Sequence, residues 1–251
     1  MNRYKRQEIA NDTLSYIQEH PEKIYSKYYN TEKCKEMKQK ELNKGDVQTK
    51  VEVRYQDVVW TVVKEDKKVT ILNFASAKNP GGGWLGGSQA QEEAIARSST
   101  MYAHIKDVNE FYKNPKHHGS PYYDNDVIYS SNVKMIKNPD GKLFNKPILF
   151  DMITCAAVNV SAIKQVDEKR VNREMKERIE NIFEVAIENG TETLVLGAFG
   201  TGVFKNKPQD VANIFKEVIY SERYKNKIPH IIFSIVVQDY LVDIFKVVEK
   251  E

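Results

Sequence analysis

Cysteine is scarce in this chain of 251 residues, in which only Cys34 and Cys155 occur. The two lie far apart and match no metal-ligand spacing, so the sequence predicts no metal site and fits a reducing compartment. Long hydrophobic runs are also missing, since no apolar stretch approaches the ~20 residues that a membrane span needs. The charged N-terminus lacks the apolar core of a signal peptide. These absences predict a cytoplasmic protein with no membrane contact.

A large excess of charge of one sign is missing as well. The chain carries 38 basic and 35 acidic side chains, which gives a formal charge of +3. A dedicated nucleic-acid binder needs clustered positive charge to neutralise phosphates, so we expect no direct binding to DNA or RNA. Hydrophobic residues make up 41% of the chain, which is ordinary for a globular protein, and the length allows a substantial core. We take a monomer as the default expectation.

The first fifty residues differ in pattern from the rest of the chain. The apolar stripe of Ala10, Leu14 and Ile17 predicts a helix over 2–19 that stops before Pro21. A polar, tyrosine-bearing stretch comes next, for which we expect loop and short helix. We therefore predict an N-terminal accessory or cap segment over 1–50 and a catalytic domain over 51–251.

From residue 51 onward, predicted strands alternate with predicted helices. Apolar, β-branched runs predict strands at 51–55, 58–63, 69–75, 127–130, 147–158, 193–199 and 230–237. Helical spacing predicts helices at 89–105, 167–189, 208–221 and 241–248. This alternation favours an α/β layer fold with a mainly parallel sheet.

Two glycine-bearing loops follow predicted strands, at the end of an α/β sheet where ligands bind. In the second loop, Gly197, Gly200 and Gly202 would let backbone N–H groups turn inward as an anion-binding nest. The helix that begins near Pro208 would add its dipole, and a diphosphate suits this arrangement. Glycine content alone leaves an ordinary strand-to-helix turn equally open.

The first loop places two carboxylates directly beyond a polyglycine turn. Gly81, Gly82 and Gly83 permit close approach of backbone to a ligand, and Glu92 and Glu93 begin the next helix. Adjacent acids at a helix start often serve only to complement the helix dipole. Cleavage of a sugar bond, however, needs a carboxyl group that protonates the departing oxygen and then activates water. Neighbouring acids that differ in burial meet this need, because one keeps a proton while the other is ionised.

The segment FASAKNPGGGWLGGSQAQEEAIARSS resembles the poly(ADP-ribose) glycohydrolase family, in which a triple glycine precedes Gln-Glu-Glu. Three further segments resemble the bacterial-type branch in matching order: SPYYDNDVIYSSNV, FDMITCAAVN and GAFGTGVFKNKPQDVA. The resemblance implies a macrodomain, with a mixed sheet between two layers of helices. It also implies hydrolysis of the ribose–ribose bonds of poly(ADP-ribose) without metal or cofactor. Cleavage from chain ends follows if residues 1–50 close the far side of the ribose.

The resemblance assigns a role to each matching residue. Glu93 would be the catalytic acid/base, and Glu92 would orient the scissile ribose. Gly81 to Gly83 would press against the diphosphate and the distal ribose, and Asn79 and Gln91 would contact ribose or anchor the loop. In the second loop the implied diphosphate contacts are Gly200, Thr201, Gly202 and Val203, with Phe204 packing near the distal ribose. Thr201 stands where cysteine is common in the family, and its hydroxyl retains a hydrogen-bond donor.

Two alternatives remain open from the sequence. One is a macrodomain that recognises ADP-ribose without cutting it, and the other is a hydrolase of mono-ADP-ribosyl protein or a small ADP-ribose derivative. We expect Trp60 and Cys155 in the core and His117 and His118 in solvent, while Trp84 could line the pocket. The aromatic residue that stacks on adenine is left open among Tyr122, Tyr123 and Tyr240.

Overall fold

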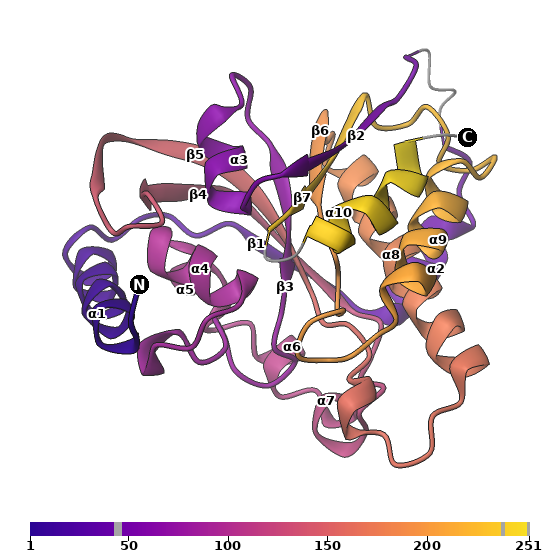
Figure 1. Cartoon of the computed structure of the whole chain (residues 1–251), viewed down its shortest axis with the longest axis horizontal. Coiled ribbons are helices and arrows are strands. Elements are labelled where there is room, and N and C mark those ends of the chain that lie inside the picture. The colour runs from indigo at the N-terminus through magenta and orange to yellow at the C-terminus, as the bar shows by residue number, and fades with distance from the viewer. Residues whose placement is uncertain (43–46, 237–238, 250–251) are drawn as a thin grey trace.

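The computed structural model describes residues 1–42, 47–236 and 239–249, and a seven-stranded sheet runs through its middle (Figure 1). The strands are β1 (Ser26–Tyr29), β2 (Lys50–Tyr55), β3 (Thr70–Phe74), β4 (Val127–Lys137), β5 (Leu143–Cys155), β6 (Thr193–Leu196) and β7 (His230–Ile235). Their order is β1-β4-β5-β3-β6-β7-β2. The pairs that involve β4 are antiparallel and the other four are parallel. The predicted mixed, mainly parallel sheet is thus confirmed.

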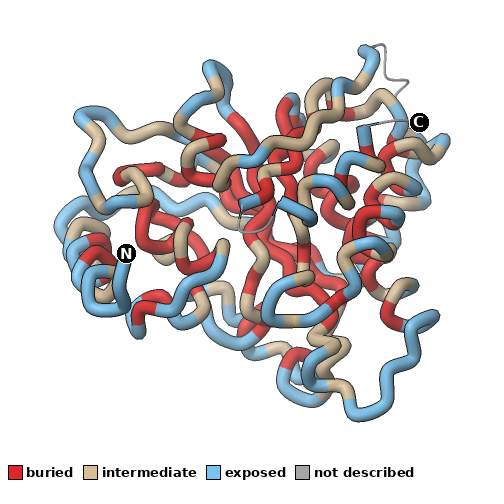
Figure 2. The backbone as a smooth tube through the Cα atoms, in the orientation of Figure 1, coloured by how far each residue is buried: buried red, intermediate tan, exposed pale blue. Residues whose placement is uncertain are grey.

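Helices cover both faces of the sheet, as Figure 1 shows. One side carries α1 (Arg3–Glu19), α3 (Val58–Lys64), α4 (Gln91–Ser98) and α5 (Met101–Ile105). The other carries α2 (Thr31–Lys38), α8 (Glu168–Glu188), α9 (Pro208–Ile219), α10 (Asp239–Phe245) and η3 (Lys246–Glu249). Short elements within loops are η1 (Trp84–Gly86), α6 (Asn109–Tyr112), α7 (Pro115–Gly119) and η2 (Val160–Ala162). The sheet separates two hydrophobic clusters, and Figure 2 shows buried residues concentrated along the sheet and on the parts of the helices that lie against it.

Helix α8 is the predicted helix that the structure matches most closely. The side chain of Asp167 caps its first turn by accepting a hydrogen bond from the Arg170 amide at 3.1 Å. Gly190, with φ 69°, follows its last turn in the left-handed conformation that ends helices. The apolar stripe lies against the sheet, where Ile179 and Ile182 are fully buried.

The strand predicted over 58–63 is wrong, because these residues form helix α3. The Asp57 side chain accepts a hydrogen bond from the Trp60 amide at 2.9 Å and so caps the helix. Within α3, Val58, Val59 and Val62 are buried at helical spacing. The cap and this tertiary packing outweigh the strand preference of β-branched residues. Trp60 is consequently only half-buried rather than a core residue.

One strand was not predicted from the sequence, and another was predicted too short. Strand β1 lies in the stretch expected to be loop and short helix, and it pairs with β4 through Ser26 and Ser130. Because β1 extends the sheet, residues on both sides of position 50 share one core. Strand β4 runs to Lys137, beyond the predicted 127–130, and forms a hairpin with β5. The last residue of the strand predicted over 230–237 lies outside the described residues, as do parts of both predicted domains.

The helix predicted over 89–105 is divided into α4 and α5. Ser99 is extended and forms an isolated bridge with Met135, and the Thr100 amide donates to the Lys134 carbonyl at 2.9 Å. This pairing with β4 interrupts the helical hydrogen bonds. In the part of the chain that the structure describes, no helix has the length and apolar character of a membrane span.

Candidate active site

The two predicted glycine loops leave the sheet at the same edge. Strands β3 and β6 are parallel neighbours with Ile71 opposite Val195, so their carboxyl ends lie together. The ring of Phe74, the last residue of β3, packs 5.6 Å from the ring of Phe199, which follows β6, and the two rings join the bases of the loops. The structure therefore brings together two segments that are more than a hundred residues apart in sequence.

The triple-glycine turn adopts a conformation that demands glycine. Gly81 and Gly82 have φ values of 75° and 61°, and the Gly82 amide donates to the Asn79 carbonyl at 2.9 Å. A Cβ on Gly81 would lie 2.8 Å from Cδ1 of Trp84. Trp84 is 1% exposed and packs on Tyr102, so it supports the turn from beneath and does not line a pocket.

Glu92 lies in the interior beside the end of β3. Its Oε2 accepts a hydrogen bond from the Ser76 amide at 2.7 Å, and its Oε1 accepts from Nδ2 of Asn73 at 3.3 Å. Burial raises the pKa of Glu92 from 4.5 to about 8, and the charge of Glu93 acts in the same direction. These hydrogen bonds oppose the rise only partly. Glu92 therefore holds a proton at neutral pH.

Because of Glu92, the free energy of unfolding should fall as the pH rises. Between about pH 4.5 and about pH 8 the folded chain keeps a proton on Glu92 that the unfolded chain has released, so raising the pH favours unfolding. Glu92→Gln removes this titration. We expect the Tm of the variant, relative to the parent, to rise from about pH 5 to about pH 8. Calorimetry across this range is the measurement, and parallel Tm curves would contradict the assignment.

Glu93 is also buried, but it faces the glycine turn. Its Oε1 accepts a hydrogen bond from the Gly83 amide at 3.0 Å, while Oε2 has no hydrogen-bond partner among the described residues. A Cβ on Gly82 would lie 2.5 Å from Oε1 of Glu93 and 3.0 Å from Oε2 of Glu92. The two carboxyl groups therefore converge on the backbone of Gly82, and only glycine leaves room for both.

The two remaining predicted residues of this loop, Gln91 and Asn79, differ in their surroundings. Gln91 donates from Nε2 to the Leu72 carbonyl at 2.6 Å and accepts at Oε1 from the Phe74 amide at 2.9 Å. Its contacts fit the anchoring role, because its side chain is engaged by the backbone of β3. Asn79 is exposed, and its amide donates to Oγ of Ser76 at 3.1 Å.

The second loop, residues 197–204, packs tightly at its base. Of its three glycines only Gly200 has a positive φ, 72°, and a Cβ there would lie 2.5 Å from the Ala157 side chain. Gly197 is needed for close approach instead, since a Cβ would lie 2.7 Å from the Ser234 carbonyl.

Thr201 lies further along the same loop and donates its hydroxyl to the Ala198 carbonyl at 2.9 Å. At the tip, Gly202 and Val203 are exposed.

A third segment lies against this loop. The ring of Tyr123 packs 6.0 Å from that of Phe204, and its hydroxyl accepts a hydrogen bond from Nδ2 of Asn159 at 3.2 Å. A polar cavity of about 170 Å³ opens here, lined by Lys78, His118, Gly119, Ser120, Pro121, Tyr123, Asn159 and Ala162. Of the other tyrosines considered for adenine, Tyr122 is covered by the Arg170 guanidinium at 3.8 Å and Tyr240 is exposed.

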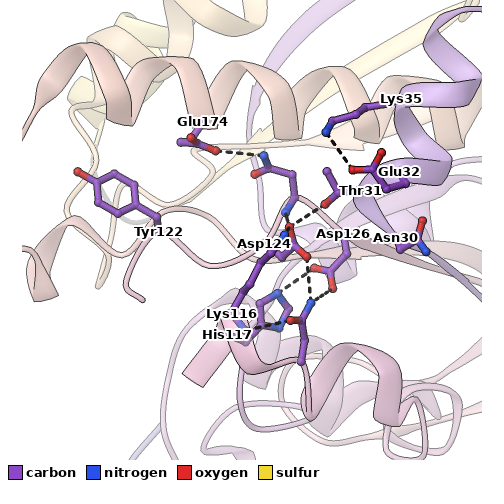
Figure 3. Close-up of polar contacts among 12 residues, drawn as sticks. Asn30, Thr31, Glu32, Lys35, Lys116, His117, Tyr122, Asp124, Asp126 and Glu174 are labelled. Carbon is purple, nitrogen blue, oxygen red and sulfur yellow. Dashed lines mark hydrogen bonds and ion pairs between the residues drawn. The ribbon is translucent and has the colours of Figure 1, made fainter. Parts of the chain in front are cut away.

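The expectation that His117 lies in solvent is wrong. Its side chain is fully buried against Phe111, and its Nε2 lies 2.9 Å from Oδ1 of the buried Asp126 (Figure 3). The neighbouring Asp124 accepts hydrogen bonds from Thr31 at 2.7 Å and Lys116 at 3.1 Å. Figure 3 thus shows that Thr31 of the N-terminal segment is bonded to Asp124, in the loop that also carries Tyr122. His118 is exposed, as predicted.

Comparison with known proteins agrees with this architecture. The model of the family described as microbial-type PARG, catalytic domain, matches residues 5–138, which include the glycine turn and both glutamates. The chain belongs to this family. The match begins within α1, so it also spans most of the N-terminal segment. Among curated proteins, none matches the chain.

Solved structures of PARG domains superimpose on nearly the whole chain. The poly(ADP-ribose) glycohydrolase of Thermomonospora curvata has a TM-score of 0.90 at 27% identity, covering 97% of this chain and 99% of that chain. The same enzyme bound to the inhibitor ADP-HPD has a TM-score of 0.88 at 27% identity, with the same coverage. The Deinococcus radiodurans glycohydrolase in complex with ADP-ribose has a TM-score of 0.81 at 28% identity, covering 89% and 93%.

In this PARG domain the residues that hydrogen-bond Glu92 were not predicted from the sequence. Asn73 hydrogen-bonds both Glu92 and Thr154. Its position as the one side-chain amide within an apolar strand is the sequence feature that could have indicated this role. Ser76 gave no comparable signal, because its amide rather than its side chain binds Glu92. Within the described residues, no group of three or more His, Cys, Asp and Glu side chains is placed to hold a metal ion.

Proposed function

We propose that this chain hydrolyses the ribose–ribose O-glycosidic bonds of poly(ADP-ribose) and releases ADP-ribose. The observation that carries the proposal is the convergence of two buried carboxyl groups, Glu92 and Glu93, on the backbone of Gly82. Family membership supports it, as do the ADP-ribose and ADP-HPD complexes of the similar Deinococcus and Thermomonospora enzymes.

In the proposed reaction Glu93 enters in its protonated form and gives that proton to the departing 2′-oxygen as the bond to the anomeric carbon breaks. Positive charge develops on the ribose, and the nearby diphosphate stabilises it. The ionised Glu93 then takes a proton from water, whose oxygen forms the new bond to the anomeric carbon. Glu92 stays neutral and donates a hydrogen bond to the ribose, which agrees with its raised pKa of about 8.

The remaining predicted residues receive substrate contacts in the same proposal. Gly81, Gly83 and Asn79 border the ribose and diphosphate at the first loop. Gly200, Thr201, Gly202 and Val203 wrap the diphosphate from the second loop, where the N-terminus of α9 adds a favourable dipole. Phe204 packs near the distal ribose and is itself supported by Tyr123.

Incubation with purified poly(ADP-ribose) tests the proposal. We expect the protein to release free ADP-ribose, which chromatography or mass spectrometry detects. Tight polymer binding without release would favour a macrodomain that only recognises ADP-ribose. Release from mono-ADP-ribosylated protein but not from polymer would favour the alternative hydrolase.

We further propose that cleavage proceeds from chain ends. Helix α1 lies beside α4 and contacts the loop that follows the glycine turn. The N-terminal segment 1–50 would therefore act as an accessory to the domain 51–251 and close the far side of the ribose, which restricts cleavage to chain ends. The size distribution of products at early times separates the two modes. End cleavage yields ADP-ribose from the start, whereas internal cleavage yields oligomers first.

The setting of the reaction is part of the proposal. We propose that the protein acts as a monomer. Cys34 and Cys155 are buried free thiols, which suits a reducing cytoplasm. The formal charge of +3 provides little general attraction for DNA or RNA.

A further inference from the structure

The loop that joins the glycine turn to α4 is held by three arginines. Arg3 donates from Nε to the Gly86 carbonyl at 2.9 Å, and Arg6 donates from Nε to the Gly87 carbonyl at 2.7 Å. Arg97 donates from NH1 to the Ser88 carbonyl at 2.7 Å. Three consecutive carbonyls are therefore bound by three guanidinium groups, two from α1 and one from α4. We call Arg3, Arg6 and Arg97 the arginine clamp.

Hydrogen bonds through Gly83 connect this loop to the carboxyl group of Glu93. The amides of Gly86 and Ser88 donate to the Gly83 carbonyl at 3.0 Å and 3.2 Å, which closes the loop on itself. The amide of the same Gly83 donates to Oε1 of Glu93 at 3.0 Å. A shift of the loop would therefore move the hydrogen-bond donor that orients Glu93.

Helix α1 packs closely against this loop. Gly87 has φ 74°, and a Cβ there would lie 2.8 Å from the Arg3 carbonyl. The helix is also fixed at points remote from the loop: the Thr13 hydroxyl donates to the Arg97 carbonyl at 2.6 Å, and the buried Lys137 ammonium donates to Asp12 at 2.5 Å. Loss of one clamp contact should therefore leave α1 in place.

The clamp also places positive charge near the catalytic carboxyl group. Burial lowers the pKa of Arg97, the negative charge of Glu93 raises it, and the positive charge of Arg6 lowers it. Arg97 is thus within electrostatic reach of both groups. Because each guanidinium donates to a carbonyl, its orientation is fixed relative to the loop.

We propose that the arginine clamp is a set of positioning residues for the glycosidase reaction. It holds residues 83–88 so that the Gly83 amide keeps Oε1 of Glu93 bound and Oε2 directed to the ribose. This inference rests on the proposed function, and it gives the N-terminal helix a role in turnover as well as in restricting access. Its members act through the loop and need no contact with substrate.

Arg6→Ala is the sharpest test, with Lys5→Ala as matched control. Lys5 lies next to Arg6 on α1 but is exposed and pairs with Glu8 at 3.0 Å. We expect Arg6→Ala to lower kcat for polymer roughly 10-fold, since small misplacements of reacting groups cost one to two orders of magnitude. KM and the Kd for ADP-ribose should change less than about two-fold, and Arg6→Lys, which retains a donor, should recover part of kcat.

Hydrogen exchange provides a readout that does not depend on turnover. The amides of Gly83, Gly86, Gly87 and Ser88 are all hydrogen-bonded, so the parent protein should protect them. We expect faster exchange over 83–88 in Arg6→Ala at unchanged global stability. Unchanged exchange, or a kcat loss that only parallels a lower Tm, would overturn the clamp. If the parent fails to release ADP-ribose while exchange responds as expected, the proposed function fails and the clamp stands as a loop-holding device.

Discussion

Glu93→Gln is expected to lower kcat for poly(ADP-ribose) hydrolysis by about 1,000-fold, within the range that a general acid–base group contributes. Gln preserves the shape of the side chain and can still accept the hydrogen bond from the Gly83 amide at Oε1. It cannot transfer the proton that the departing oxygen needs. We therefore expect the Kd for ADP-ribose to stay within a few-fold of the parent value. Steady-state kinetics and calorimetric titration give the two quantities.

Two variants make this result specific. Glu222→Gln removes an exposed carboxylate and should leave kcat unchanged. Glu92→Gln replaces a group that already holds a proton at neutral pH, so it should lose less activity than Glu93→Gln. If Glu93→Gln turned over polymer at nearly the parent rate, the acid/base would have to be another group. Loss of ADP-ribose binding by the same variant would indicate a binding role instead.

Gly82→Ala is expected to lower kcat about 100-fold, the scale on which displaced catalytic groups lose activity. Its φ of 61° is unfavourable for alanine by about 1–2 kcal/mol, so the Tm should also fall. The added methyl group would lie 2.5 Å from Oε1 of Glu93, so the carboxyl group must move. Kinetics and calorimetry together measure both effects.

Gly86→Ala is the matched control for this prediction. Gly86 lies in the same loop, it is exposed, and a Cβ there meets no atom within 4 Å. We expect its kcat and Tm to stay close to those of the parent. Parent-like activity in Gly82→Ala would show that the position of Glu93 is uncritical, which would contradict the proposed mechanism.

The reliable predictions from sequence were those with strong local signals. Helix α8 combines a capping aspartate, an apolar stripe and Gly190, so its ends and its buried face were predicted correctly. The run 69–75 predicted β3 because a strand covered on both faces is almost wholly apolar. The segment 58–63 failed because its residue types favour a strand, while its cap and burial make it α3.

In the candidate site, too, some residues were predicted from neighbours in the sequence and others were not. The glycine turn and the pair Glu92 and Glu93 lie within fifteen residues of one another, so the sequence alone was enough to propose them as one candidate site. His117 was misjudged because its partner Asp126 and the ring of Phe111 meet it only in the folded chain. The clamp of Arg3 and Arg6 was equally hidden, since the carbonyls that they bind are about eighty residues away.

Most of the alternation of strands and helices, the glycine positions and the pair of acids follow from the sequence, because each depends mainly on neighbours along the chain. The folded structure is what buries Glu92 deeply enough to raise its pKa to about 8, so that it keeps a proton at neutral pH. It also brings Arg3 and Arg6 of the N-terminal segment to the loop before α4, because hydrogen bonds between distant segments form only when folding brings their donors and acceptors together.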